Sequence, residues 1–123
     1  MKHLYAIALL AVCFALPAKS QSDIATIHFY APDKFGVRHL PLYVDEKTVG
    51  SLHGRDMIDV PTTPGKHTVH SSQKDSGIFL EVTAGGDYYV KVSLSEHGFP
   101  PPGRVDLVDP SQGKYELEKM KKH

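Results

Sequence analysis

The chain has 123 residues, a length typical of one domain, and its 14 basic and 14 acidic side chains balance. This balance argues against the basic surface that nucleic acids and anionic membranes attract, so we expect neither as a partner. The single cysteine excludes a disulfide framework.

The first twenty residues have the layout of a secretory signal peptide. Lys2 provides a basic start, residues 4–16 form an uncharged apolar run, and the small residues Ala18 and Ser20 follow. The run is shorter than the roughly 20 apolar residues that a membrane span needs, so we expect no stable span. A buried N-terminal strand or helix is the alternative, which explains the flanking residues less well. The pattern therefore predicts a signal peptide over residues 1–20.

Cleavage is expected near Ser20–Gln21, which leaves one exported domain over residues 21–123. Its predicted core covers residues 24–109, and a tail covers residues 110–123. Two lysines leave with the signal peptide, so the remaining chain carries 12 basic and 14 acidic residues. The expected location is the periplasm or the extracellular space.

Cys13 raises the possibility of a lipid anchor. In bacterial lipoproteins the modified cysteine follows Gly, Ala or Ser, whereas Val12 precedes it here. Lipidation would also cut the apolar run in its middle. We therefore expect no lipid at Cys13, with a lipoprotein as the alternative.

Apolar residues recur at every second position from Ile24 onward, which is the period of a half-buried strand. The strands are separated by short connections rich in glycine and proline, too short for parallel crossovers. This pattern predicts an all-β fold, a small antiparallel β-sandwich of about seven or eight strands. The expected strands cover residues 25–30, 40–44, 48–52, 57–60, 66–72, 78–83, 88–95 and 105–108.

Residues 78–83 and 88–95 are predicted to form a hairpin, because the turn at Gly85 and Gly86 joins them directly. On the second strand, alternation divides the side chains between two faces. The predicted core face carries Tyr88, Val90, Val92 and Leu94, and the other face carries Tyr89, Lys91 and Ser93.

Two segments break the strand pattern. Residues 97–103 contain three prolines, which cannot donate ladder hydrogen bonds, so this segment is predicted to be a stiff surface loop. Residues 110–123 combine a few apolar residues with Lys and Glu. They suit a short C-terminal helix or a frayed tail.

Turn and strand signatures occur at the aromatic strand end before Pro32 and in the segments 42–50, 64–69 and 84–92. Their spacing resembles a known bacterial family, domain of unknown function 2846, and PEGA-like β-sandwiches. The resemblance covers residues 24–108 and departs from the pattern at Glu46, where such domains often have glycine, and at Val12, where many members carry a lipidation signal. It implies a β-sandwich in the cell envelope and no established activity.

Histidine is abundant, and neutral imidazole is a common metal ligand. His67 and His70 form the tightest cluster, but residues three apart on a strand face opposite sides, so they cannot chelate one ion without a bulge. His28 could join either one from another strand. We assign no metal site and no cofactor, and keep a histidine-based metal-binding periplasmic protein as an alternative. After cleavage the histidines are His28, His39, His53, His67, His70, His97 and His123.

No catalytic motif is visible. The sequence has neither a G-x-S-x-G elbow nor a cysteine in the mature chain. The carboxylates lie scattered in predicted turns and strand edges, where they serve solubility. We expect no catalytic residues and no enzyme activity, with an enzyme lacking a recognisable motif as a further alternative. Examples of the scattered carboxylates are Asp45, Glu46, Glu81, Asp87 and Asp106.

Six aromatic residues are more than a small core needs, which favours an exposed binding surface. Phe99 on the proline loop is the predicted binding residue, because a surface loop does not need an apolar anchor to fold. The alternative is that Phe99 plugs the end of the sandwich. The favoured function is a non-catalytic interaction or structural module with an envelope protein or a glycan as partner. The six aromatic residues are Tyr30, Phe35, Tyr43, Phe79, Tyr89 and Phe99.

Overall fold

The computed structural model describes residues 23–35, 38–72, 77–96 and 101–122, and these residues form eight strands and one helix. In chain order they are β1 (Ala25–Tyr30), β2 (His39–Val44), β3 (Lys47–His53), β4 (Met57–Thr62), β5 (Gly65–His70), β6 (Ile78–Val82), β7 (Asp87–Leu94), β8 (Gly103–Val108) and α2 (Pro110–Lys121).

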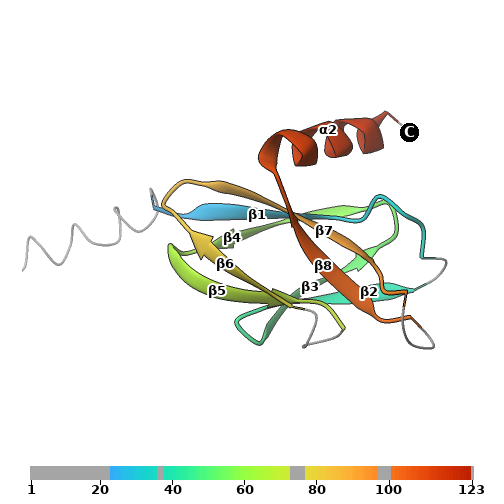
Figure 1. Ribbon diagram of the computed structural model, residues 1–123, viewed down its shortest axis with the longest axis horizontal. Coiled ribbons are helices and arrows are strands. Elements are labelled where there is room, and N and C mark those ends of the chain that lie inside the picture. The colour runs from blue at the N-terminus through green and yellow to red at the C-terminus, as the bar shows by residue number, and fades with distance from the viewer. Residues whose placement is uncertain (1–22, 36–37, 73–76, 97–100, 123) are drawn as a thin grey trace, which may run out of the picture.

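The strands form two sheets that face each other (Figure 1). One has the order β4-β1-β7-β8 and the other the order β3-β2-β5-β6. This confirms the predicted small β-sandwich of about seven or eight strands. The helix α2 lies against the outer face of the first sheet and contacts β7.

The core lies between the inner faces of the two sheets, and the period-two pattern places most of it correctly. On β7 the side chains of Val90 and Val92 are fully buried, and Tyr88 and Leu94 pack against the same cluster. The predicted core face of this strand is therefore confirmed. Other buried members are Ile27, Phe29, Leu40, Leu42, Leu52, Val69, Leu80 and Val105.

The β2–β3 hairpin is built on a two-residue turn in which Asp45 and Glu46 both have positive φ, 52° and 69°. Positive φ at both positions is the mark of a type I′ turn, which matches strand twist but usually contains Asn and Gly. The pairing shifts between Leu42 and Tyr43, which leaves Val49 as an extra residue on β3. This bulge changes every pairing beyond it.

The predicted hairpin of residues 78–83 and 88–95 is wrong. In the structure β6 pairs with β5, and β7 pairs with β1 and β8, so the chain crosses from one sheet to the other between them. The Tyr88 hydroxyl accepts a hydrogen bond from the Thr83 amide at 2.7 Å, which satisfies that donor without a ladder partner. A hairpin and a crossover between sheets both show alternating apolar residues around a Gly-Gly turn, so the sequence does not distinguish the two arrangements.

One strand pair also departs from the antiparallel expectation. β1 pairs with β7 in parallel, with Thr26 beside Asp87 and Tyr30 beside Lys91. The argument from short connections applies to consecutive strands, and these two are separated by five others. Among the described residues, every other strand pair is antiparallel.

The predicted C-terminal helix or tail is a helix. Asp109 caps it by accepting a hydrogen bond from the Ser111 amide, and Pro110 occupies the first turn, where no amide donor is needed. No helix in the described part of the chain is long and apolar enough to cross a membrane. The predicted signal peptide over 1–20 with Cys13, and the predicted binding residue Phe99, lie outside the described residues.

Candidate functional site

The helix α2 covers side chains on the outer face of its sheet. Gly113 packs directly on Tyr89: a Cβ there would lie 2.5 Å from the Tyr89 Cβ and Cγ. Tyr30 at the end of β1 is fully buried, and its hydroxyl donates to the Glu116 carboxylate at 3.0 Å. Both tyrosines point away from the sandwich core, so their burial depends on the helix.

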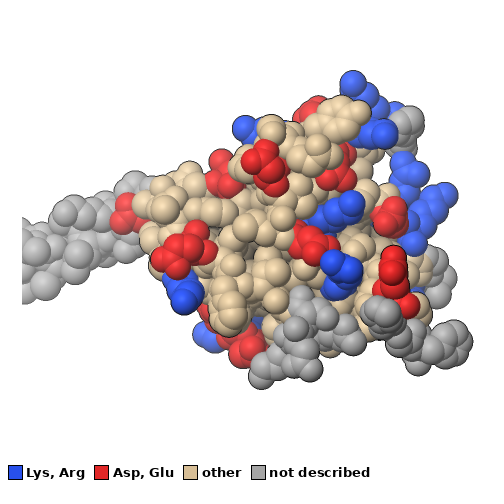
Figure 2. Space-filling model, viewed as in Figure 1, with Lys and Arg blue, Asp and Glu red and all other residues tan. Residues whose placement is uncertain are grey.

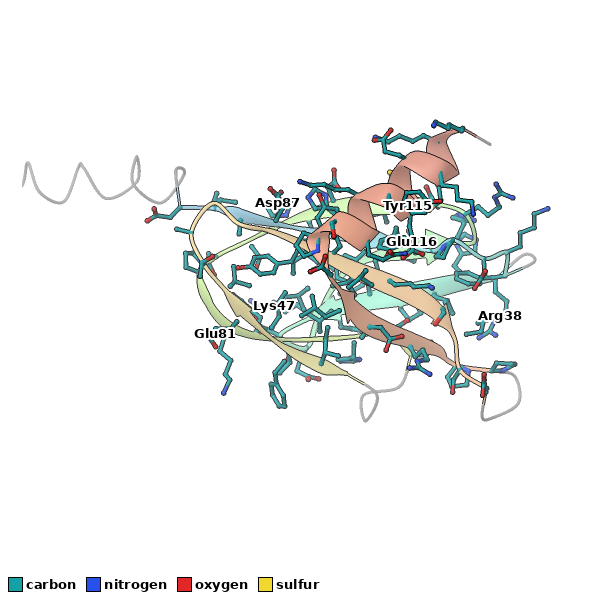
Figure 3. The ribbon with its side chains drawn as sticks, turned by 45° about the horizontal axis from the view of Figure 1, so that its top comes forward. Arg38, Lys47, Glu81, Asp87, Tyr115 and Glu116 are labelled. Carbon is teal, nitrogen blue, oxygen red and sulfur yellow. The ribbon has the colours of Figure 1, made fainter. Side chains whose placement is uncertain are left out.

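A cleft of about 620 Å³ lies between α2 and the loops at one end of the sandwich. We call it the α2 cleft. Its volume falls in the range of small-ligand sites, about 300–1,000 Å³. Figure 3 shows Tyr115 and Glu116 on the helix above the sheet. The cleft is lined by Pro32, Arg55, Gln112, Tyr115, Glu116, Lys119 and Met120.

The α2 cleft has a net positive character. Its one carboxylate, Glu116, is engaged by the Tyr30 hydroxyl and lies 3.7 Å from the Lys91 ammonium. Burial and this carboxylate together raise the pKa of Tyr30 well above its usual range, so Tyr30 remains a donor. Within the described ranges no acidic side chain forms an ion pair with Arg55 or Lys119. Lys and Arg side chains also gather around the end of the molecule where α2 ends (Figure 2).

The position of Arg55 is set by a strained turn between β3 and β4. Its φ is 60°, a left-handed conformation that costs a non-glycine residue roughly 1–2 kcal/mol. The Arg55 amide donates to the Asp33 carbonyl at 3.0 Å. A Cβ at the preceding Gly54 would lie 2.5 Å from the Phe35 nitrogen, so the turn is pressed against the β1–β2 loop. Strain held in place by such contacts is typical of residues that serve a site.

His28 lies on the opposite flank of α2 and is held as a cation. Its Nδ1 lies 2.7 Å from Asp59 and its Nε2 lies 2.9 Å from Asp87, and the ring stacks on Tyr89 at 4.7 Å. Both nitrogens must carry protons to donate to two carboxylates. Burial alone would lower the pKa of His28, but the two carboxylates outweigh it and raise the pKa. A doubly protonated imidazole has no lone pair for a metal or for base catalysis.

His67 is held in the same way at the β2–β3 turn. Its Nδ1 donates to the Asp45 carboxylate and its Nε2 to the Thr63 carbonyl at 2.7 Å. The carboxylate raises the pKa of His67, and these hydrogen bonds lower the pKa of Asp45. Asp45 also accepts from the Thr68 amide at 3.0 Å. These bonds hold the strained Asp45–Glu46 turn against β5.

His67 and His70 do not converge on a common metal site, because their rings have separate hydrogen-bond partners. His70 instead donates from Nδ1 to the Ser71 carbonyl at 2.8 Å and stacks on Tyr43 at 4.7 Å. In the ranges that the structure covers, no group of three or more His, Cys, Asp or Glu side chains could hold a metal ion.

The aromatic residues divide between buried and exposed positions. Tyr30, Phe35 and Tyr89 are buried, whereas Phe79 is 74% exposed on β6 with the Lys66 ammonium 5.8 Å from its ring centre. Tyr115, for which we predicted no role from the sequence, is 63% exposed beside the α2 cleft. Its only signal was an aromatic residue in an otherwise charged C-terminal segment.

The comparisons with known proteins add no assignment. No family model matches the chain, and no curated protein or solved structure matches it. The resemblance to domain of unknown function 2846 therefore remains a prediction. The site must be interpreted from its own geometry.

Proposed function

We propose that the protein is an exported, non-catalytic binding module that takes the free carboxylate of a partner's chain end in the α2 cleft. The observation that carries this proposal is the presence of two cations, Arg55 and Lys119, beside the Glu116 carboxylate, which already has the Tyr30 hydroxyl and the Lys91 ammonium as partners. A cleft with this charge distribution favours an anionic ligand group.

The geometry suits a carboxylate attached to an apolar residue. An arginine guanidinium can bind a carboxylate with two parallel hydrogen bonds, and the nearby end of α2 carries the further cation Lys119. The exposed ring of Tyr115 and the half-buried Met120 offer apolar contact beside the charges. A chain end with a C-terminal hydrophobic residue presents both features at once.

The histidine clusters support a binding role over catalysis. His28 and His67 each donate from both nitrogens to acceptors on the protein, so neither is available as a base while these contacts persist. The Glu116 carboxylate is likewise held by the Tyr30 hydroxyl. Glu116 therefore ties the helix to the sheet, whereas the two histidines tie strands and turns of the sandwich to one another.

The test uses a fluorescent peptide that ends in leucine, with a free carboxylate in one form and an amide in the other. Fluorescence anisotropy should show the acid binding at least tenfold more tightly, because a hydrogen bond to a charged group contributes about 1.5–3 kcal/mol. Arg55→Gln with Lys119→Gln should remove this preference. Lys114→Gln, on the exposed flank of the same helix, is the matched control. Equal binding of acid and amide would refute the proposal.

Export is part of the same proposal. The basic start, the apolar run and the small residues before Gln21 support a signal peptide, and the resemblance to the bacterial family supports an envelope location. Intact-mass measurement of protein from the envelope should give a chain that begins at or near Gln21. A diacylated chain that begins at Cys13 would overturn this and favour a lipoprotein.

A further inference from the structure

We propose that His39 and His53 form a two-histidine site for a divalent transition-metal ion, with Cu²⁺ bound most tightly. The two residues are direct partners across the β2–β3 pair. Their ring centres lie 3.8 Å apart with the rings tilted by 54°. This site is separate from the α2 cleft and does not depend on the proposed function.

Both imidazoles are on the open surface of the sandwich. The adjacent Leu40 and Leu52 are fully buried, so alternation places His39 and His53 on the outer face of their sheet, and both are exposed. The helix covers the other sheet. A metal ion could therefore reach the pair directly from solvent.

The two rings differ chemically from His28 and His67. Those histidines donate from both nitrogens, mostly to carboxylates, and must be protonated to do so. For His39 and His53, the described part of the chain provides one interaction, the contact between the two rings. Their ring nitrogens are therefore available to ligate a metal ion.

A small opening of the pair would suit chelation. With metal–nitrogen bonds of about 2.0–2.1 Å at right angles, the ring centres would lie roughly 4.5 Å apart. The exposed rings need to separate by less than 1 Å from their present positions, which rotation about side-chain bonds allows. Cross-strand pairing fixes the two backbones, so little further ordering is required.

The ligand set predicts which metals bind. Two imidazoles with water in the remaining positions suit Cu²⁺ and Ni²⁺, which accept nitrogen and oxygen ligands in tetragonal geometry. The general order of affinity places Cu²⁺ above both Ni²⁺ and Zn²⁺. With two protein ligands, we expect a weaker site than a structural centre with three or four.

The test is a Cu²⁺ titration of the exported chain that begins at Gln21, which contains neither Cys13 nor His3 and so has no thiol and no histidine beside its amino terminus. Isothermal titration calorimetry should give one tight equivalent, and electron paramagnetic resonance should show coordination by two imidazole nitrogens. His39→Gln and His53→Gln should each weaken binding more than tenfold and remove the two-nitrogen signal. His123→Gln, which removes a histidine elsewhere, should change neither.

A variant with the same number of histidines, one of them moved to a different cross-strand position, tests whether Cu²⁺ binding requires the direct His39–His53 pair. Ser51→His with His53→Ser keeps the composition but moves one imidazole two residues along the same face of β3, to a diagonal position about 7–8 Å away. It should lose the tight equivalent while circular dichroism shows an unchanged fold. Unaltered Cu²⁺ affinity in this variant or in His39→Gln would overturn the proposal.

Discussion

Gly113→Ala should destabilise the protein, although the same change stabilises most helices. In an exposed helix interior, alanine is favoured over glycine by about 0.8–1.0 kcal/mol. Here the new Cβ would lie 2.5 Å from the Tyr89 Cβ and Cγ, whereas carbon atoms normally approach to about 3.5–4.0 Å. The contact involves the rigid base of the Tyr89 side chain, so the helix must move outward by about 1 Å.

Overpacking of this kind costs typically 1–3 kcal/mol. Outward movement also stretches the hydrogen bond between Tyr30 and Glu116, now 3.0 Å long. These losses exceed the gain in helix propensity, and we expect the free energy of unfolding to fall by about 1–2 kcal/mol. Chemical denaturation followed by circular dichroism measures the change.

The matched control is the neighbouring exposed residue Lys114. The difference between Lys114→Gly and Lys114→Ala gives the intrinsic preference for alanine on this helix. At position 114 the alanine variant should have the higher free energy of unfolding, whereas at position 113 the glycine protein should have the higher value. If Gly113→Ala is as stable as the parent protein, α2 does not pack on Tyr89 as described.

Three further predictions concern the sandwich. The pKa of His67 is raised above its ordinary value of 6.5, so its contribution to stability is complete below that pH and is lost as pH rises through the folded-state pKa. The pKa of Asp45 is lowered from 3.8, so its contribution to stability is lost as pH falls through the folded-state pKa. In a series of denaturation experiments at different pH, His67→Gln should reduce the fall in the free energy of unfolding on the alkaline side. An unchanged slope there would contradict the assigned contacts. Val92→Ala should lower the free energy of unfolding by about 1–3 kcal/mol because the side chain is fully buried, whereas Lys91→Ala should lower it much less. Equal losses would mean that the two faces of the strand have been assigned the wrong way round. Tyr88→Phe leaves the Thr83 amide at the β6–β7 crossover without its acceptor, so the free energy of unfolding measured by denaturation should fall by about 1 kcal/mol. An unchanged value would mean that water replaces the hydroxyl.

The strands could be predicted from the sequence because each half-buried strand carries its own period of two. On β7 this pattern also separates Val92 from Lys91 correctly. Pairing between strands could not be predicted in the same way. A turn such as Gly85–Gly86 reverses the chain in one sheet or between two, and the outcome depends on which partners the strands find elsewhere.

The candidate sites depended on features that leave little trace in a single sequence. Without the bulge, the turn at Asp45–Glu46 would pair His39 with Leu52; the extra residue on β3 brings His53 opposite instead. The α2 cleft exists because Gly113 lets the helix approach Tyr89, and a glycine in a charged segment gives no such signal. The strain at Arg55 is likewise visible only in the backbone.

The parallel pairing of β1 with β7 has a consequence for the order in which the chain can fold. β1 is an inner strand of its sheet, and one of its two neighbours begins at Asp87, after six other strands have been synthesised. Until that segment is present, the first sheet can contain only the β1–β4 pair, and two strands alone are marginally stable in water. Contacts between such distant segments also slow folding, because the intervening chain must be closed into a loop first. A chain interrupted before β7 should therefore lack the complete first sheet, and the core between the two sheets should form only when nearly the whole polypeptide is available.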